Sequence, residues 1–211
     1  MRLVADDADE SISLDLVVDY GKPVVLQGDR GLSQKSTTPG NASYYYSYTR
    51  SPAAGLIAID GQEHRVSGLA WIDREWSTSS LGPDLVGWDW FSVQLIDGHD
   101  LMLYALRGPS GAVQPSSAGT LVTAEGLSRR LERNQFDLRP ADYWRSPATG
   151  VRYPVVWEIL VPELELDLIV RAVIPDQEQD LAVRYWEGSV DYIDRGSGRR
   201  LGRGYMELTG Y

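Results

Sequence analysis

The chain has 211 residues, a formal net charge of −10 at pH 7 and no cysteine. The acidic surplus disfavours nucleic acid and anionic membranes as partners, because both reward a basic surface. The absence of cysteine excludes a disulfide framework, a thiol nucleophile and a cysteine-ligated metal. No run of about 18 apolar residues is present, so we expect no transmembrane segment, and the acidic start Met1–Glu10 is unlike a signal peptide. We expect a soluble chain, and its compartment stays open.

The first part of the chain reads as short strands separated by turn signals. Alternating or β-branched runs end at Gly21-Lys22-Pro23 and again at Asp60-Gly61, a dipeptide typical of hairpins. The predicted strands here are Ser11–Tyr20, Val24–Leu26, Ser43–Arg50, Ala54–Ile59 and His64–Trp76.

The same pattern continues from Trp88 to the end of the chain. Evidence for helices is poor, with short turns predicted only at Pro83–Leu85 and Asp176–Leu181. About eight strands follow, which is close to the number that closes an up-and-down barrel around side chains or one small ligand. They are Trp88–Ile96, Asp100–Arg107, Gly119–Glu125, Arg130–Leu138, Arg152–Val161, Leu164–Ile174, Val183–Asp194 and Gly204–Tyr211.

A change of domain is predicted in the loop Ser77–Gly87, which is rich in Ser, Gly and Pro. Residues 1–80 would supply about four or five strands of a first β domain, and residues 81–211 would form a second, antiparallel β-barrel. Four or five strands are too few for a barrel. Either they join an open sheet, or the chain lacks an N-terminal portion of its parent.

The stretch Gly68–Leu95 contains four of the seven tryptophans and several carboxylates. Because side chains alternate along a strand, Trp71, Asp73 and Glu75 share one face, and Arg74 lies on the other. Residues two apart on a strand lie roughly 6.5–7 Å apart. Ionising one of the two carboxyls therefore disfavours ionising the other.

The second segment of this stretch places an acid on an apolar face. Trp88 and Trp90 share one face, whereas Asp89 falls with Phe91 on the other. A carboxylate on an apolar face is costly unless it is paired or protonated. Two interpretations stay open for each acid here: an ion pair with Arg74 or another arginine, or a functional group.

Common catalytic motifs are absent. The chain has no GxSxG, HExxH, GxxxxGK[ST] or strand-linked GxGxxG motif. His64 and His99 lie beside predicted turns, where we expect exposed side chains, so we predict neither a metal nor a cofactor. Tyr44 and Tyr46 share a face of their strand and are predicted to form core or cavity wall.

Several segments, in order along nearly the whole chain, resemble the AttH-like group related to carotenoid 1,2-hydratases. The segments that carry the resemblance are Gln27–Gly31, Ala42–Tyr46, Gly68–Ser77, Gly87–Phe91, Asp100–Tyr104, Tyr185–Gly188 and Gly204–Tyr211. The resemblance implies two lipocalin-like β-barrel domains, of which this chain holds the C-terminal part of the first and all of the second. It also implies possible export and an association with a transport system.

The carotenoid hydratases add water across an isolated double bond without a cofactor, and related enzymes guide polyene cyclisations. In the hydratases a Tyr-x-Asp pair is essential, and the acid serves as proton donor. The resemblance gives this role to Asp73. Trp71 stands where the hydratases have tyrosine, and Glu75 stands where asparagine is expected.

The chemistry itself favours such a site. Protonating an alkene requires a carboxyl that stays protonated near neutral pH, and indole faces would stabilise the resulting carbocation by about 0.5–2 kcal/mol per well-placed ring. We predict Asp73 and Glu75 as catalytic residues, and Trp71, Trp88, Trp90, Tyr44 and Tyr46 as substrate-binding residues. The predicted supporting residues are Asp89, Arg74, Trp186 and Glu187.

The sequence thus predicts a cofactor-independent hydratase or cyclase for a hydrophobic polyene or isoprenoid-like molecule. The alternative is a non-catalytic protein that binds a hydrophobic ligand or lipid, because a cavity lined by Trp and Tyr holds such a ligand without reacting with it. A third hypothesis, a hydrolase, lacks a recognisable nucleophile–base pair. The first two differ in whether Asp73 and Glu75 face a cavity or pair with Arg74, Arg107 or Arg184.

Overall fold

The structure is a computed structural model, and it describes residues 1–7, 9, 11–36, 38, 40–77, 81–82, 84–180 and 183–211. Its strands form two antiparallel sheets, which we call the N-sheet (β1–β6) and the C-sheet (β7–β16). The change from one sheet to the other falls between Trp76, where β6 ends, and Gly87, where β7 begins.

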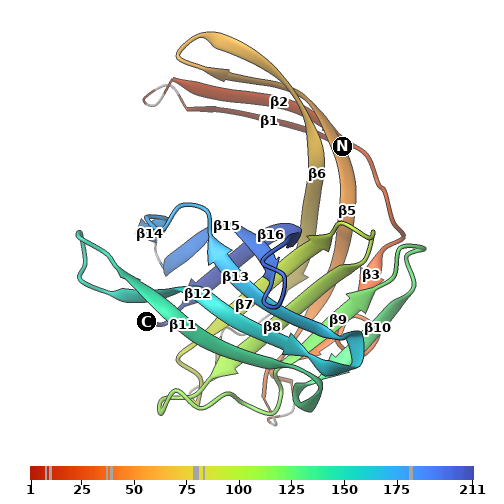
Figure 1. Cartoon of the computed structure of the whole chain (residues 1–211), viewed down its shortest axis with the longest axis vertical. Helices are drawn as coiled ribbons and strands as arrows, with labels where there is room; N and C mark the ends of the chain where they lie inside the picture. Colours follow the sequence, from red (N-terminus) through yellow and green to blue (C-terminus); the bar gives the residue numbers. More distant parts are fainter. Residues whose placement is uncertain are drawn as a thin grey trace.

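The N-sheet is organised around one long strand, β5, which pairs with β2, β3, β4 and β6. A register shift between Tyr48 and Ser51 divides β5 into two parts. Beyond the shift, β5 and β6 continue with β1 and β2 into a curved arm that extends away from the C-sheet (Figure 1). The strands are β1 (Arg2–Asp7), β2 (Ile12–Val18), β3 (Val25–Leu26), β4 (Leu32–Gln34), β5 (Ala42–Ile59) and β6 (Gln62–Trp76).

The C-sheet curls upon itself in the order β10-β9-β8-β7-β16-β15-β13-β12-β11, with β14 beside β15. Its end strands, β10 and β11, are joined by the short helix η1 (Arg133–Gln135), and another such helix, η2 (Pro162–Leu164), precedes β13. The strands are β7 (Gly87–Leu95), β8 (Asp100–Arg107), β9 (Ala118–Val122), β10 (Ser128–Glu132), β11 (Asp137–Arg145), β12 (Arg152–Val161), β13 (Leu166–Ala172), β14 (Glu178–Asp180), β15 (Arg184–Asp194) and β16 (Arg200–Thr209).

Apolar side chains fill the inside of the curled C-sheet. Phe91, Trp157, Trp186 and Met206 belong to this core and are almost fully buried, and the rings of Phe91 and Trp157 meet edge to face with centroids 5.2 Å apart. Burial of large rings is the main source of stability in such a core. The C-sheet is therefore packed with protein side chains.

A second core lies between the two sheets. It contains Tyr45 of the N-sheet together with Met102, Tyr104 and Leu106 of β8, and Trp88 and Trp90 of β7 pack against it. Since the first core covers the other face of β7 and β8, these strands are covered on both faces. The burial explains why β8 reads as a nearly continuous apolar run, a pattern more typical of doubly covered strands.

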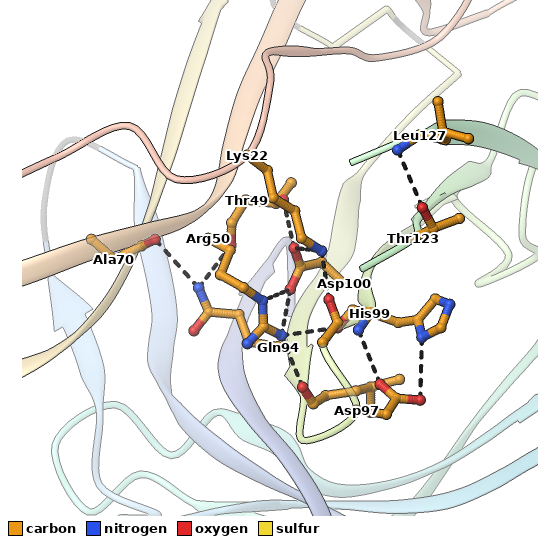
Figure 2. A network of polar contacts seen from close by, with 12 residues as sticks. Lys22, Thr49, Arg50, Ala70, Gln94, Asp97, His99, Asp100, Thr123 and Leu127 are labelled. Atoms are coloured by element: carbon orange, nitrogen blue, oxygen red, sulfur yellow. Dashed lines mark hydrogen bonds and ion pairs between the residues drawn. The ribbon is translucent and has the colours of Figure 1, made fainter. Parts of the chain in front are cut away.

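A buried polar cluster ties the same two sheets together at the turn between β7 and β8 (Figure 2). Asp100 is fully buried and accepts a hydrogen bond from Thr49 Oγ1 at 2.7 Å. Its carboxylate also pairs with Lys22 Nζ at 2.8 Å and with Arg50 at 2.7 Å. Gln94 of β7 adds a bond to the carbonyl oxygen of Thr49.

The all-β prediction is confirmed, and the differences from the predicted elements are local. The predicted strands Ser43–Arg50 and Ala54–Ile59 are parts of one strand, β5, which continues through Pro52. The predicted strand Arg130–Leu138 is interrupted by η1, whose capping box at Glu132 and Gln135 turns the chain between β10 and β11.

Two further strands and most of a third, residues 139–145 of β11, were missed, and one predicted helical turn is wrong. Arg2–Asp7 forms β1, and Leu32–Gln34, predicted as loop, forms β4 because it pairs with β5. Residues Glu178–Asp180 pair with β15 as strand β14 instead of forming a helical turn. Leu181 and Pro83, the latter at the start of the other predicted helical turn, lie outside the described residues.

Candidate functional site

A pocket of about 280 Å³ lies between the N-sheet and the C-sheet. Its walls come from both sheets: β5 and β6 on one side, and β7, β8 and β16 on the other. The pocket is therefore outside the packed core of the C-sheet. It is lined by Lys35, Ser43, Tyr45, Asp73, Glu75, Ser77, Leu81, Trp88, Trp90, Tyr104, Leu106 and Glu207.

The Asp73 carboxylate is held by three hydrogen-bond donors. Ser47 Oγ lies 2.5 Å from its Oδ1, Trp71 Nε1 lies 2.9 Å from the same oxygen, and Tyr45 OH lies 3.0 Å from Oδ2. Ser47 faces Asp73 across the β5–β6 pair, which explains this contact. Three donors fix the orientation of the carboxylate and favour its charged form.

Asp73 faces the pocket and remains exposed to solvent. Desolvation of its carboxyl by the surrounding protein atoms raises the pKa of Asp73, whereas the hydrogen bonds from Ser47, Trp71 and Tyr45 lower it and the charge of Glu75 raises it. The net effect is an increase. Burial also raises the pKa of Tyr45 well above its usual value, with help from the charges of Asp73 and Glu75, so Tyr45 remains a donor at neutral pH.

Glu75 is the partner of a lysine. Lys35 Nζ lies 2.5 Å from Glu75 Oε1, and the Ser43 hydroxyl donates to the same oxygen. The Lys35 ammonium also lies 5.4 Å from the centre of the Tyr104 ring. These contacts make Glu75 half of an ion pair on the pocket wall, so it differs from Asp73, which accepts only neutral donors in the described contacts.

Glu207 brings a third carboxylate to the pocket, from the opposite sheet. The indole Nε1 of Trp88 donates to its Oε1 at 2.6 Å. Burial raises the pKa of Glu207 to about 7; the bond from Trp88 opposes this, and the charges of Glu187, Asp73 and Glu75 add to it. Glu207 therefore changes its protonation state near neutral pH.

Aromatic rings form the apolar part of the pocket. Trp90 Nε1 donates to Tyr45 OH at 3.2 Å, which links β7 to β5, and the Trp71 and Trp90 rings meet edge to face with centroids 6.1 Å apart. Trp90 lines the pocket, whereas Trp71, predicted as a substrate-binding residue, is not among the lining residues and reaches the site through its hydrogen bond to Asp73. An aromatic pocket with a few convergent polar groups is the usual form of a small-molecule site.

Asp89, the acid predicted on an apolar face, is buried and forms an ion pair with Arg107. The distance from its Oδ2 to Arg107 Nε is 3.2 Å, and Tyr211 OH donates to Oδ1 at 2.6 Å. Burial raises the pKa of Asp89 to about 6, against the opposing effects of Arg107 and Tyr211. Asp89 is on the face of β7 away from the pocket, where it fastens the C-terminal residue to the sheet.

The other predicted site residues are spread over different places. Tyr44 and Tyr46 lie on the outer face of β5, opposite the pocket, and Tyr44 contacts Trp76 there. Arg74 is exposed on the same outer face, paired in register with Tyr46. Trp186 is fully buried in the core of the C-sheet. These four positions therefore do not line the pocket.

Glu187 lies next to the pocket without lining it. It is paired in register with Glu207 across β15 and β16, and it accepts a hydrogen bond from Tyr205 OH at 3.3 Å. Two carboxyls in such a cross-strand pair repel each other when both are charged. Glu187 therefore affects the pocket by raising the pKa of Glu207.

Sequence reasoning missed Tyr45, Glu207 and Lys35. Tyr45 lies on the same side of the β5–β6 pair as Asp73, but alternation along one strand does not show which face of β5 meets the other sheet. Glu207 alternates with the buried Met206 and Leu208, which places it on the outer face of β16, but the register of β16 with β7 cannot be read from the sequence. His64 and His99 lie outside the pocket, and His64 is exposed as predicted.

In the part of the chain that the structure describes, no three His, Cys, Asp or Glu side chains are grouped as metal ligands. The described helices include none long and apolar enough to cross a membrane. The curled antiparallel sheet and the pocket beside it define a lipocalin-like protein. The chain belongs to the AttH-like family, whose model matches residues 1–211.

Solved structures agree with this assignment. A protein from Nitrosomonas europaea described as AttH is 36% identical, with a TM-score of 0.87, and the match covers 100% of this chain and 64% of that chain. Kievitone hydratase from Nectria haematococca is 16% identical over 99% of this chain and 64% of its own, with a TM-score of 0.78. CghA is 16% identical over 97% and 62%, with a TM-score of 0.54.

The low identity of the last two structures makes them evidence for the fold alone. This chain spans 64% of the length of the Nitrosomonas europaea protein. No curated protein sequence matches the chain.

Proposed function

We propose that the protein is a cofactor-independent enzyme of the hydratase type, acting on a hydrophobic small molecule by carboxyl-driven proton transfer. The observation that carries the proposal is the pocket between the sheets, in which Asp73 faces a cavity walled by Trp88, Trp90 and Tyr45. The arginines that could have paired with Asp73 have other positions. Arg107 pairs with Asp89, Arg184 with Asp180, and Arg74 is on the outer face.

The arrangement supports both steps of a hydration. A carboxyl whose pKa is raised by loss of water is a better proton donor near neutral pH than an exposed one. The indole faces beside it stabilise a positive charge that develops on the substrate. Kievitone hydratase, a protein of the same fold, carries this type of reaction in its name, and we extend the type of reaction, without its substrate, to this chain.

The same aromatic walls support a second candidate, a protein that binds a hydrophobic ligand without changing it. The hydrogen bonds from Ser47, Trp71 and Tyr45 favour this candidate, because they stabilise the charged form of Asp73 and make it a weaker acid than burial alone would. An association with a transport system belongs to this second candidate. A hydrolase needs a nucleophile activated by a base, and in the described contacts Ser43 and Ser47 each donate to a pocket carboxylate without a histidine nearby.

The substitution Asp73→Asn separates the two candidates. It keeps the size of the side chain and removes the acid–base group, so we expect product formation to fall by about 10²–10⁴-fold while ligand binding, followed by quenching of tryptophan fluorescence, persists. Kievitone, geraniol and farnesol serve as probes, and mass spectrometry detects a product one water heavier or an isomeric ring.

The matched control is Glu63→Gln, which makes the same carboxyl-to-amide change at an exposed position of β6 outside the pocket. It should leave turnover unchanged. Binding of a probe by the unchanged protein and by Asp73→Asn, with no product from either, would leave the binding protein as the function.

A further inference from the structure

Two of the three carboxyls that line the pocket, one from each sheet, lie in different surroundings. Asp73 of β6 accepts hydrogen bonds from Ser47, Trp71 and Tyr45. In the contacts of the described residues, Glu207 of β16 accepts one, from Trp88. Hydrogen bonds donated to a carboxyl favour its charged form, so the number of donors alone separates the two groups.

The charges around the two groups separate them further. Glu207 is paired across the strands with Glu187, and among the described residues no basic side chain lines the pocket on the C-sheet side. The only lysine of the pocket wall in the described residues, Lys35, is bound to Glu75. Like charges raise the pKa of Glu207, whose burial already favours the neutral form.

We propose that Glu207 is the proton donor of the pocket and that Asp73 is its partner base, a division of roles that rests on the proposed function. Two carboxyls whose surroundings separate their acidities are a recurrent arrangement for acid–base catalysis. The resemblance to carotenoid hydratases gives the donor role to Asp73. The hydrogen bonds and charges around the two groups instead favour Glu207 as the donor and Asp73 as the base.

The proposed step is balanced without a cofactor. The O–H proton of Glu207 passes to one alkene carbon, the C=C electron pair forms the new C–H bond, and the neighbouring carbon becomes a cation next to the indole rings. A water from solvent adds to that carbon and forms the C–O bond, while its proton goes to the Asp73 carboxylate. Transfer of a proton from Asp73 back to Glu207, through solvent, restores the starting state.

Two indoles report on the two carboxyls directly, without any substrate. Trp88 Nε1–H is bonded to Glu207, and Trp71 Nε1–H is bonded to Asp73. The ¹H–¹⁵N signals of these two indoles, assigned with Trp88→Phe and Trp71→Phe, should therefore follow pH with different midpoints. We expect the Trp88 signal to titrate near pH 7 and to stop titrating there in Glu207→Gln, and the Trp71 signal to titrate at lower pH.

The kinetic test uses the same amide variants. Glu207→Gln retains an oxygen that can accept from Trp88 and loses the proton, so turnover of the probes should fall by about 10²–10⁴-fold. In the unchanged protein, activity should fall as pH rises above 7, because Glu207 loses its proton there. The residual activity of Glu207→Gln should lack this fall. Glu187→Gln leaves the pocket lining intact and removes a like charge. It should retain activity. The fall in activity at high pH should move to lower pH by about half a unit, because the pKa of Glu207 is no longer raised by the charge of Glu187.

The results distinguish the two proposals. Turnover that is lost in Asp73→Asn but kept in Glu207→Gln, or a Trp71 signal that titrates above the Trp88 signal, overturns the donor role of Glu207 and leaves the proposed function intact. The absence of turnover in the unchanged protein with every probe overturns the proposed function and the donor role with it. A well-dispersed set of indole signals in each variant shows that it is folded.

Discussion

At the scale of single residues, the site depends on small differences in what surrounds each acid. Asp89 is buried, Glu207 is half-buried and Asp73 lies exposed on the pocket wall, and desolvation raises the pKa of each carboxyl. Asp89 has a guanidinium and a phenol as partners, Asp73 has three neutral donors, and Glu207 has one indole. Partner type therefore decides whether an acid fastens the fold or remains available for chemistry.

Glu207 should make the stability of the protein depend on pH. Its pKa in the folded chain is about 7, above the ordinary value of 4.5, so the folded state binds the proton more tightly than the unfolded state. The stabilisation is complete below pH 4.5 and is lost as pH rises through 7. Glu207→Gln lacks this dependence, so its stability relative to the unchanged protein should rise between these values and then level off.

The expected gain is on the order of 3 kcal/mol above pH 7. Urea unfolding at a series of pH values measures it, and it requires no substrate. A difference between the two proteins that stays constant from pH 4 to pH 8 would show that Glu207 is not perturbed by the fold.

At the scale of strands, close backbone packing fixes how β16 meets β7. A Cβ added at Gly204 would lie 1.7 Å from the carbonyl oxygen of Ser92 on β7, and a backbone atom cannot move away as a flexible side chain can. Gly204 thus holds a position in the strand pair that also carries Glu207 and Trp90 in register.

We expect Gly204→Ala to destabilise the protein by about 1–3 kcal/mol, the usual cost of forcing extra atoms into a packed region. Gly68→Ala is the matched control, because Gly68 also lies within a strand and an added Cβ there meets no atom within 4 Å. The control should be neutral or slightly stabilising, since alanine restricts the unfolded chain more than glycine. Thermal unfolding of both variants makes the comparison, and equal losses would contradict it.

Alternation along single strands was enough to predict part of the site. It correctly placed Asp73 and Glu75 on one face of β6 and Asp89 on an apolar face of β7. It could not say which face of β5 meets the C-sheet, so Tyr44 and Tyr46 were chosen in place of Tyr45. The choice depends on which side the other sheet covers, and that side is set by contacts far apart in the sequence.

The register between distant strands could not be predicted either, because it also depends on contacts far apart in the sequence. Glu207 meets Trp90 across β16 and β7, although more than a hundred residues separate them in the chain. The strand Leu32–Gln34 was missed because only its pairing with β5 makes it a strand. Local pattern thus predicted the fold class and most strands, and pairings distant in sequence determined the pocket.

At the scale of the whole molecule, the pocket exists because two sheets meet. The buried cluster around Asp100 joins them, since Thr49 and Arg50 come from β5, Lys22 precedes β3, and Asp100 begins β8 (Figure 2). Removing one partner from such a cluster leaves buried charges without compensation.

Asp100→Asn should lower the free energy of unfolding by about 3–5 kcal/mol, because Lys22 and Arg50 lose their shared counter-charge. Asp97→Asn, an equal change on the exposed turn of the same hairpin, is the control and should have little effect. Hydrogen exchange should show faster opening of β5 near Thr49 in Asp100→Asn. Protection there equal to that of the unchanged protein would mean that the apolar contacts alone hold the sheets together.

The covering of β7 and β8 on both faces also bears on how such a protein can evolve. One face belongs to the interior of the C-sheet, and the other is half of the pocket, so a mutation on these strands is selected on two surfaces at once. Each sheet contributes one of the two pocket acids that have no basic partner among the described contacts, Asp73 and Glu207. One sheet alone does not contain both acids. Recombination that duplicates or transfers a single sheet therefore does not transfer the pocket with it.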